Sequence, residues 1–453
     1  MTPTAFVKQL AMIPCPTSPE PHPFRQLASG PTQEHAWDRG PRIVCIETAI
    51  PHDVMPGLLA LRIHTDAGTA GGLPVSGHGE TYYVPTAAAA VIHDFFAPRL
   101  LGSDAMAIES HWRFLYERMT AFGGTGAELR ALSAVDLALW DIAGQILQVP
   151  VWRLLGGPVR DFMPVYNSCG GPFYGRSNRK VPAASGWPGH GDPGQPGPLE
   201  DNWASVHTPE QLAEELVELG YRGMKLWSFD AVYRRSGGQT ISSQDLREGL
   251  QPFERIRDRV GDRIELMLDG HGFFTLAAAR RIADGMVPIR PLWLEDVLRP
   301  ESVHAMAEFR RQCRVPIAVS EMLVEADSYR QVLDAGAADF VMIDPTWVGG
   351  ISASRRIADL AQLYQIPVLM HDCTGPLTLL AGLAIGGSHT AVAMQETVRA
   401  HLKTLYPLLI DDTIAVSNGN LQLPNRSGIG SRWLPELFDH SHPGYRVSTF
   451  KAG

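Results

Sequence analysis

The sequence predicts an α/β protein, a modified (β/α)8 TIM barrel with an α+β capping domain before it. Two patterns support this fold class. After Pro164, short apolar runs alternate with helical stretches, and eight such runs follow one another. Eight parallel strands joined by helices close into a barrel. Between an irregular arm and Pro164, strand-like alternation is followed by helical periodicity, which is typical of an antiparallel sheet with helices beside it.

The composition limits the class of protein. With 453 residues, 45% of them hydrophobic, the chain can bury a large core and divide into two domains. A net charge of −9 without a basic stripe argues against a nucleic-acid partner. Five scattered cysteines without CxxC pairs indicate reduced thiols and a cytoplasmic protein. We find no apolar run long enough to span a membrane and no signal peptide, so we expect no membrane partner.

The predicted organisation has four parts. Residues 1–40 are polar and rich in proline, and we expect an irregular arm. Residues 41–160 form the capping domain and residues 161–400 the barrel. Residues 401–453 are expected to return to the capping domain.

The capping domain is expected to contain three strands followed by helices. The expected elements are strands at 42–50, 57–65 and within 71–80, and helices at about 86–99, about 105–121 and 134–146.

The barrel strands are expected where the apolar runs lie. They are predicted at 164–168, 222–227, 264–268, 291–294, 315–320, 339–343, 366–370 and 391–395. Helical stretches join them, such as 211–219, which Thr208 opens with Gln211 at capping-box spacing. Residues 170–205, rich in Gly and Pro, predict a long loop after the first strand, and a second insertion is expected at about 230–250. Either a plain surface insertion or a substrate lid fits the first loop.

Three carboxylates end three successive predicted strands. Glu295 follows Asp269 by 26 residues, and Glu321 follows Glu295 by 26. The C-terminal ends of neighbouring parallel strands meet at one face of a barrel. Three carboxylates so close repel one another unless a cation lies between them. All-oxygen ligation selects a hard divalent ion, most naturally Mg²⁺.

The next strand ends carry an acid–base pair. Asp344 ends the sixth strand and His371 the seventh, so Asp344 can accept a hydrogen bond from one ring nitrogen of His371 and make the other more basic. Asp372 is expected to face away and serve the structure. On the third strand, His271 lies two residues after Asp269 and therefore faces the same side.

Two further strands bring polar groups to the same face. Lys225 and Trp227, two apart, end the second strand on one side, and Glu396 ends the eighth. Lys225 fits either a substrate contact or an ion pair with a metal-binding acid. Trp227 fits either an apolar wall of the substrate site or the barrel core.

These groups fit the removal of a proton α to a carboxylate. Such a proton is very weakly acidic, and a divalent cation on both carboxylate oxygens stabilises the enediolate formed by its loss. A side-chain base takes the proton. Return of a proton to carbon gives racemisation or epimerisation, whereas loss of a β-hydroxyl gives a 2-keto-3-deoxy acid.

At this point the chain resembles the enolase superfamily, in its mandelate racemase-like branch, over residues 40–435. The resemblance lies in the helix ALSAVDLALWDIAG with VPVWRLLGG after it, the evenly spaced acids, the Asp344–His371 pair and the late segment LPNRSGIGSRW. It implies an enolase-like fold in which Asp269, Glu295 and Glu321 hold one Mg²⁺ per site. It also implies that Asp344–His371 is the acid/base pair and that Glu396 hydrogen-bonds a substrate carboxylate oxygen.

The resemblance also implies that capping-domain loops determine specificity. These loops would be 50–57 and 76–83, and the substrate-binding candidates in the second are His78, Tyr82 and Tyr83.

The chain departs from the family at one motif. Racemases of the family carry Lys-x-Lys at the end of the second strand, but this chain has Lys225-Leu226-Trp227. Trp227 cannot transfer a proton. By resemblance to some sugar-acid dehydratases of the superfamily, His271 is the acid that protonates the departing hydroxyl, a role that His371 can also fill.

We therefore expect a Mg²⁺-dependent carbon–oxygen lyase, a dehydratase of a sugar acid or hydroxy acid. The alternatives are a racemase or epimerase that uses His271 and His371, and a catalytically idle binding protein of the same fold. The expected partners are a small-molecule carboxylate substrate and further copies of the chain, as a dimer or an octamer, as is common among relatives. The substrate itself does not follow from the sequence.

Overall fold

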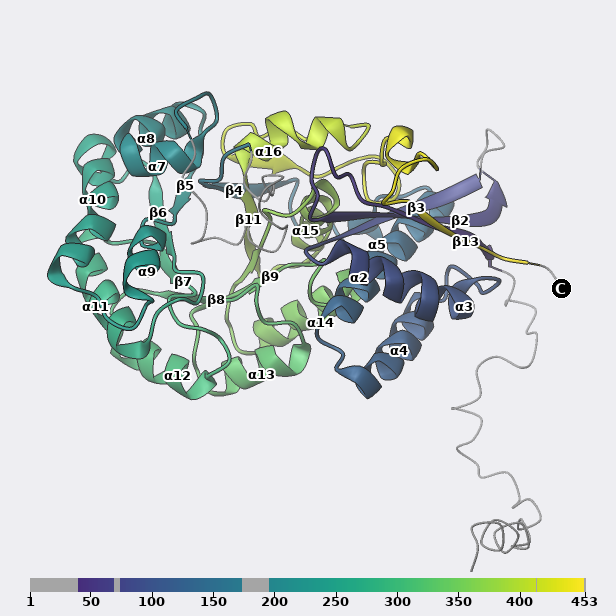
Figure 1. Ribbon diagram of the computed structural model, residues 1–453, viewed down its shortest axis with the longest axis horizontal. Helices are drawn as coiled ribbons and strands as arrows, with labels where there is room; N and C mark the ends of the chain where they lie inside the picture. The colour runs from purple at the N-terminus through teal and green to yellow at the C-terminus, as the bar shows by residue number, and fades with distance from the viewer. Residues whose placement is uncertain (1–39, 69–73, 173–194, 413, 452–453) are drawn as a thin grey trace, which may run out of the picture. The chain divides into compact units, whose positions relative to one another are not determined.

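The computed structural model describes residues 40–68, 74–172, 195–412 and 414–451 (Figure 1). The arm predicted for residues 1–40 lies outside the described residues, apart from Gly40. From Pro41 onward the chain forms one unit by its contacts.

Eight parallel strands form the predicted barrel. Each strand from β4 to β11 pairs with the next, and β11 pairs with β4, which closes the sheet. The strands are β4 (Phe162–Ser168), β5 (Gly223–Leu226), β6 (Glu265–Asp269), β7 (Trp293–Glu295), β8 (Ile317–Val319), β9 (Phe340–Ile343), β10 (Val368–Met370) and β11 (Val392–Thr397). All eight predicted strands are confirmed, with ends that differ by at most two residues.

Helices follow the barrel strands and surround the barrel (Figure 1). They are α8 (Pro209–Glu218), α10 (Ser243–Val260), α11 (Leu276–Met286), α12 (Val303–Gln312), α13 (Ala326–Asp334), α14 (Gly350–Leu363), α15 (Pro376–Ser388) and α16 (Arg399–Thr404), with short turns at Val287–Ile289 and Tyr406–Leu408. Helix α11 shows the reason for this packing, because its buried residues Ala278, Ile282 and Met286 recur every four positions. The capping box expected at Thr208 is absent; Ser242 and Asp245 form one at α10 instead.

The two predicted insertions contain helices. Within 170–205, residues 173–194 lie outside the described residues, and α7 (Asp201–His207) ends the segment, so a loop throughout is wrong there. Within 230–250, α9 (Asp230–Ser236) follows β5, and the start of α10 fills the rest.

The capping elements form an antiparallel sheet with helices beside it, as predicted. The sheet has the order β13-β1-β2-β3. Its elements are β1 (Ile43–Ala49), β2 (Leu58–Gly68), β3 (Pro74–Tyr82) and β13 (Arg446–Thr449), and the helices are α2 (Pro85–Ala90), a π-helical turn (Val91–Phe96), α3 (Ala97–Leu100), α4 (Ile108–Met119), a short turn (Thr120–Phe122), α5 (Ala127–Leu147) and α6 (Val151–Leu154). The helix expected at 86–99 is thus divided by the π-helical turn.

Segment 76–83 is mostly strand, not loop. Residues up to Tyr82 belong to β3, and their glycines reflect close packing by α5. A Cβ atom on Gly77 or Gly79 would lie 2.0 Å from the carbonyl oxygen of Ala138 or Ala134. The sequence pattern therefore reports a helix lying directly on a strand.

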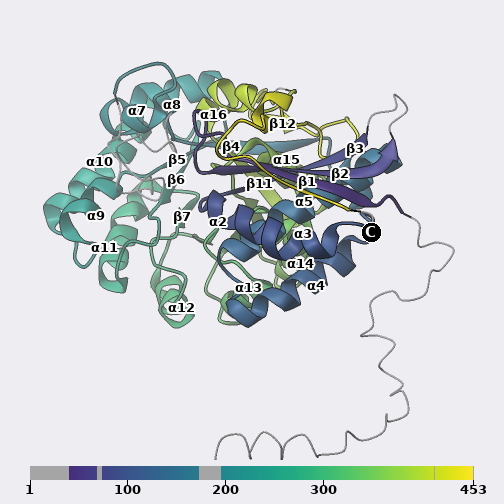
Figure 2. The ribbon, with the colours of Figure 1, turned by 45° about the vertical axis from the view of Figure 1, so that its right-hand side comes forward.

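The end of the chain returns to the first sheet, as expected. Strand β13 pairs with β1, and Trp433 donates its indole N–H to the carbonyl of Gly79 in β3 at 3.1 Å. The segment also contains β12 (Asn420–Gln422), which pairs with β4 of the barrel, and a short turn at Pro435–Phe438. Figure 2 shows β13 beside β1 and β12 near β4. The exact domain boundaries stay predictions.

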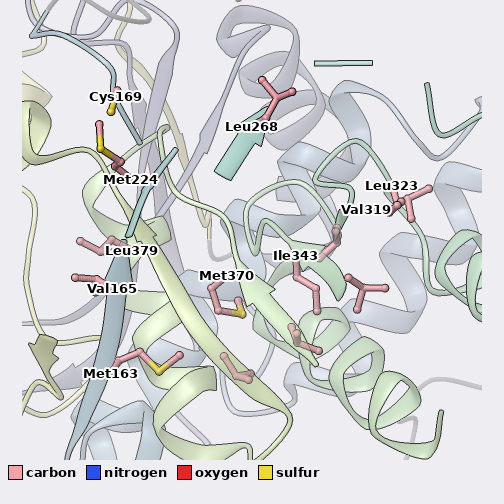
Figure 3. Close-up of a cluster of buried hydrophobic side chains, with 14 of the residues drawn as sticks. Met163, Val165, Cys169, Met224, Leu268, Val319, Leu323, Ile343, Met370 and Leu379 are labelled. Carbon is pink, nitrogen blue, oxygen red and sulfur yellow. The ribbon is translucent and has the colours of Figure 1, made fainter. Parts of the chain in front are cut away.

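The hydrophobic core lies on both sides of the barrel wall. Inside the barrel, a layer forms from Tyr166, Met267, Trp293, Ala318, Met342 and Leu369. Outside it, the strands pack on the surrounding helices, as the side chains of Met163, Leu268 and Ile343 show (Figure 3). In the described parts of the chain, no helix is long and apolar enough to cross a membrane.

Candidate active site

A cavity lies at the C-terminal ends of the barrel strands. It contains about 310 Å³ of empty space, part of which is open to solvent. Its lining consists of Tyr83, Ser168, Lys225, Trp227, Asp269, His271, Glu321, Trp347, His371, Cys373 and Glu396. The structure thus brings most of the sequence-predicted site residues to one place.

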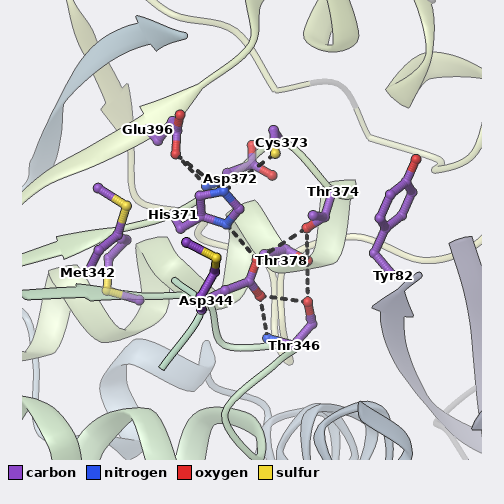
Figure 4. A network of polar contacts seen from close by, with 12 residues as sticks. Tyr82, Met342, Asp344, Thr346, His371, Asp372, Cys373, Thr374, Thr378 and Glu396 are labelled. Atoms are coloured by element: carbon purple, nitrogen blue, oxygen red, sulfur yellow. Dashed lines mark hydrogen bonds and ion pairs between the residues drawn. The ribbon is translucent and has the colours of Figure 1, made fainter. Parts of the chain in front are cut away.

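The Asp344–His371 pair is formed as predicted. Nδ1 of His371 lies 2.7 Å from Oδ2 of Asp344, and the other oxygen of Asp344 accepts the backbone N–H of Thr346 at 2.8 Å and its hydroxyl at 2.7 Å (Figure 4). This bond fixes Nδ1 as the protonated nitrogen, so Nε2 is directed elsewhere. Nε2 lies 3.4 Å from Sγ of Cys373 and 3.8 Å from Oε2 of Glu396.

The surroundings of His371 favour its protonated form. Burial disfavours the imidazolium, but the neighbouring Cys373, Glu396 and Asp344 outweigh it and hold the pKa of His371 well above its usual value. Cys373 acts here as a hydrogen-bonding thiol, because burial raises its own pKa to about 11. The pair therefore has high affinity for a proton.

Lys225 lies among the acids of the neighbouring strands. Its ammonium is 3.2 Å from Oδ2 of Asp269 and 2.9 Å from Oε1 of Glu396, and it also pairs with Glu295. Asp269 and Glu295 are direct partners in the β6–β7 register, so their carboxylates are neighbours. Burial disfavours the charged lysine, yet Glu295 and Glu396 hold its pKa well above the usual value.

The three acids Asp269, Glu295 and Glu321 could together carry more negative charge than the single Lys225 ammonium neutralises. Burial, joined by repulsion from Asp269, raises the pKa of both Glu295 and Glu321, against the attraction of Lys225. Asp269 behaves differently: burial favours its neutral form, but His271 and Lys225 lower its pKa to about 2.

The residues present fit a divalent cation by their chemistry. Within the described ranges, Oε2 of Glu321 is buried without a hydrogen-bond partner. The atoms of Asp269, Glu295 and Glu321 that could bind a metal are all carboxylate oxygens, which a hard divalent cation prefers. No group of three His, Cys, Asp or Glu side chains among the described residues is already arranged as a metal site. In this structure the Lys225 ammonium contacts Asp269, Glu295 and Glu396. A metal held by Asp269, Glu295 and Glu321 would require this ammonium to withdraw toward Glu396.

His271 is held in a restricted conformation beside the acids. Its φ of +49° is in the left-handed region, and its backbone N–H donates to Oδ1 of Asp269 at 2.9 Å. Its Nδ1 lies 3.0 Å from Oδ1 of Asp230, the first residue of α9. Burial opposes protonation, but Asp230 and Asp269 raise the pKa of His271 to about 9. His271 is therefore a proton donor in this structure.

The capping-sheet candidates are placed differently from one another. Tyr83 lines the cavity, and Tyr82 is buried behind it with the two rings 4.8 Å apart. His78 does not line the cavity that the described residues form: its Nδ1 accepts the backbone N–H of Trp433 at 3.3 Å. His78 belongs to β3 rather than to a loop, four residues before Tyr82 on the same face of the strand.

Sequence reasoning missed several residues of the site. Ser168, Trp347 and Cys373 line the cavity, and Asp230 orients His271. Ser168 ends β4, and Trp347 and Cys373 follow Asp344 and His371 closely, so a systematic inspection of every strand end could have found them.

Two of these missed residues offer hydrogen bonds to the cavity, and Asp372 does not. Among the described residues, Oγ of Ser168 and Nε1 of Trp347 are buried without a partner. Asp372 accepts the hydroxyl of Tyr406 at 3.1 Å and is outside the lining, in line with the expectation that it faces away.

Two family models match the chain. A model of the mandelate racemase / muconate lactonizing enzyme N-terminal domain matches residues 38–156, and an enolase C-terminal domain-like model matches residues 209–437. The matches include strands β1 to β3 and barrel strands β5 to β11.

Curated relatives include two sugar-acid dehydratases. The chain is 28% identical to a D-xylonate dehydratase of Haloferax volcanii over 409 residues, 86% of this chain and 87% of that protein. It is 27% identical to a D-gluconate dehydratase of Thermoproteus tenax over 334 residues, 74% of this chain and 60% of that protein.

Solved structures give the same likeness over nearly the whole chain. An enolase protein from environmental sequencing of the Sargasso Sea is 36% identical with a TM-score of 0.77, over 91% of this chain and 100% of that one. An enolase of the mandelate racemase subgroup from Agrobacterium tumefaciens is 30% identical with a TM-score of 0.76, over 90% and 99%.

Proposed function

Because the chain belongs to the mandelate racemase/muconate lactonizing enzyme family of the enolase superfamily, we propose that it is a Mg²⁺-dependent sugar-acid dehydratase. It would remove the proton α to the substrate carboxylate and then release the β-hydroxyl as water. The observation that carries this proposal is that His371, which is hydrogen-bonded to Asp344, lines one cavity together with His271 and the carboxylates of Asp269 and Glu321. A base, an acid and a carboxylate cluster are the groups that this reaction needs.

We propose that Asp269, Glu295 and Glu321 hold the metal ion. The all-oxygen donor set, the excess of buried negative charge and the unpartnered oxygen of Glu321 support this assignment. Bound there, Mg²⁺ supplies Lewis acidity that makes the α-proton of a carboxylate substrate easier to remove. Lys225 and Glu396 then remain to contact the substrate carboxylate.

His371 is the proposed base. Its Nδ1–H is occupied by Asp344, so Nε2 is the nitrogen that takes the α-proton. Asp344 also stabilises the imidazolium that results. His371 acts from its neutral form, and Glu396 beside it adds to the stabilisation of the imidazolium.

His271 is the proposed acid for the departing hydroxyl. Asp230 and Asp269 favour its protonated form, and the ring lies 5.5 Å from that of Trp227. A positively charged histidine at this position can donate its proton to a β-hydroxyl as the carbon–oxygen bond breaks. Trp227 then acts as a wall of the site that takes no proton.

The proposed substrate is a small polyhydroxylated carboxylic acid. Ser168 and Trp347 line the cavity and offer polar groups without partners among the described residues, which suits a ligand with several hydroxyls. The names of the two dehydratase relatives point to C5 and C6 sugar acids. Tyr83 is proposed to cover the substrate from the capping side, with Tyr82 behind it.

A racemase or epimerase is the second candidate. It is supported by the presence of two histidines in the lining of the same cavity, since one could remove the proton and the other return it. The substitution of Trp227 for the second lysine of the racemase motif favours dehydration instead. Assembly as a homo-oligomer and a cytoplasmic location stay predictions.

A substrate screen in D₂O tests the proposal. The protein with Mg²⁺ is mixed with a library of sugar acids that includes D-xylonate and D-gluconate, and products are followed by NMR and by an assay for 2-keto acids. We expect a 2-keto-3-deoxy product from one group of substrates. Deuterium at the α-carbon or inversion without keto acid would make the protein a racemase or epimerase. No exchange with any sugar acid, amino acid or cyclic carboxylate would support the idle protein.

A further inference from the structure

A chain of hydroxyl groups continues behind Asp344, away from His371. Thr346 donates both its N–H and its hydroxyl to Oδ1 of Asp344, and the hydroxyl of Thr374 lies 3.5 Å from Oδ2 (Figure 4). Thr378, in the first turn of α15, joins these two threonines. Its Oγ lies 3.2 Å from Oγ of Thr346 and 3.2 Å from Oγ of Thr374.

The chain of hydroxyls ends on a carboxylate of the capping sheet. Oε1 of Glu80, in β3, accepts both the backbone N–H and the hydroxyl of Thr378, each at 2.6 Å. Glu80 is fully buried. It fits against the start of α15 only because residue 375 is glycine, where a Cβ atom would lie 2.5 Å from Oε1. The next residue of β3 adds a second link, since the hydroxyl of Thr81 donates to the carbonyl of Thr346 at 2.9 Å.

These contacts restrict the directions of the hydroxyls. A threonine hydroxyl has a single proton. Thr346 gives its proton to Asp344 and Thr378 gives its proton to Glu80. Thr378 therefore only accepts from Thr374, whose proton is shared between Thr378 at 3.2 Å and Oδ2 of Asp344 at 3.5 Å. Without Glu80, the hydroxyl of Thr378 is free to turn toward Thr346, and the set of donors around Asp344 loses its fixed arrangement.

We propose that Glu80 and Thr378 are positioning residues that orient Asp344, and through it the imidazole of His371, from the capping sheet. The inference rests on the proposed function, in which His371 is the base. It assigns to β3 a role in the acid–base step that goes beyond shaping the substrate site. Neither residue touches the substrate cavity: they act through Thr374, whose hydroxyl contacts both Thr378 and Asp344.

A nearby carboxylate provides a matched control. Asp136, in α5, accepts the backbone N–H and the hydroxyl of Ser352 at 2.9 and 2.6 Å, in the first turn of α14. It caps a barrel helix from the capping domain as Glu80 does. The hydroxyl of Ser352 receives the indole N–H of Trp140, however, and within the described residues no hydrogen bond of these three side chains reaches Asp344. Deleting Asp136 therefore tests helix capping alone.

The experiment compares Thr378→Val with Thr378→Ser, and Glu80→Ala with Glu80→Gln and Asp136→Ala. Activity is measured with the sugar acid found in the screen. Loss of an orienting partner typically costs about 10–100-fold, so we expect Thr378→Val and Glu80→Ala to lower kcat by at least roughly tenfold with little change in KM. Thr378→Ser and Glu80→Gln keep the hydroxyl and the acceptor oxygen and should retain most activity. Asp136→Ala should lower the unfolding temperature without lowering kcat.

A second readout needs no substrate. The Nδ1–H proton of His371, assigned by its loss in His371→Asn, is observed by NMR in the metal-free protein. We expect it to shift and to exchange faster with water in Thr378→Val, and to stay unchanged in Thr378→Ser and Asp136→Ala. Valine has nearly the shape of threonine, so Thr378→Val decides the case if Glu80→Ala fails to fold.

Two failures are distinguishable. Unchanged kcat and an unchanged His371 resonance in Thr378→Val would overturn this inference and leave the proposed function intact. Full α-proton exchange in His371→Asn would remove His371 as the base, and the His371 resonance would then still decide whether β3 orients the pair.

Discussion

Buried carboxylates occur in two regions of this chain and are held in opposite ways. Between the capping helix α5 and the elements around it, Asp136 accepts two hydrogen bonds from Ser352, and Asp141 accepts the backbone N–H groups of His78 and Ile429 at 2.8 Å each. These acids are satisfied by neutral donors. Each one joins segments that are far apart in the sequence.

At the barrel mouth, carboxylates face each other instead. Asp269 and Glu295 share the Lys225 ammonium, and Oε2 of Glu321 has no hydrogen-bond partner among the described residues. The difference teaches how to separate structural from functional acids in a buried set. Asp136 and Asp141 have their donors within the fold, whereas Glu321 lines the cavity with an oxygen that lacks a donor and is therefore a candidate to bind a ligand.

The largest expected effect is that of metal removal. A chelator should lower activity by at least roughly 10³-fold, because the acids of the mouth then lack the cation that they are arranged to hold. Added Mg²⁺ should restore activity and raise the unfolding temperature of the metal-free protein. Full activity in excess chelator would show that the acids at the barrel mouth do not need a metal ion for the reaction, and the contrast with the acids of the capping region would fail.

A change at His271 should separate the two chemical steps. In His271→Asn we expect dehydration to fall by about 10²-fold or more, because the departing hydroxyl loses its proton donor. Exchange of the α-proton, which belongs to His371, should persist. The ratio of keto-acid formation to deuterium incorporation measures the effect, and an equal loss of both would contradict the assignment of His271 as the acid.

Neutralising acids from the two regions should change stability with opposite signs. Asp141→Ala leaves the N–H groups of His78 and Ile429 without an acceptor and should lower the free energy of unfolding by roughly 1–3 kcal/mol. Glu321→Gln relieves repulsion and should raise the stability of the metal-free protein by up to about 1 kcal/mol. Denaturant unfolding of both variants measures these changes. A loss of stability in Glu321→Gln would contradict the expectation that this acid, unlike Asp141, destabilises the metal-free protein.

A further expected effect is a pH dependence of stability that comes from the capping region. Burial raises the pKa of Asp136 to about 7, against the hydrogen bonds from Ser352 that lower it. The unfolded chain releases this proton near pH 4, so the contribution of Asp136 to stability is full below pH 4 and is lost as the pH rises toward 7. In Asp136→Asn, the fall in unfolding free energy between these pH values should be smaller. An identical pH slope in both proteins would contradict this pKa.

The barrel and the main site residues could be predicted because they depend on local pattern. Apolar runs set the strands, and strand ends set the positions of Asp269, Asp344 and His371. Segment 76–83 was expected to be a specificity loop, and the packing of α5 against Gly77 and Gly79, far along the sequence, could not be predicted. The structure places His78 against Trp433, and its substrate-binding role stays a prediction.

Contacts across long sequence distances explain what remained hidden. The hydrogen bond from Thr378 to Glu80 joins residues that are 298 positions apart, and no local sequence pattern predicts it. The left-handed backbone of His271 and its partner Asp230 likewise depend on how α9 packs after β5. The place of the Lys225 ammonium between three carboxylates depends on the closed barrel.

The most direct test of this account is the exchange of the substrate α-proton in D₂O with Mg²⁺, compared between the unchanged protein and His371→Asn. The account predicts keto-acid formation by the unchanged protein. It predicts neither exchange nor product in His371→Asn, although that variant keeps its unfolding temperature and its response to Mg²⁺. Exchange that persists in His371→Asn would contradict the central claim that the Asp344–His371 pair removes the proton.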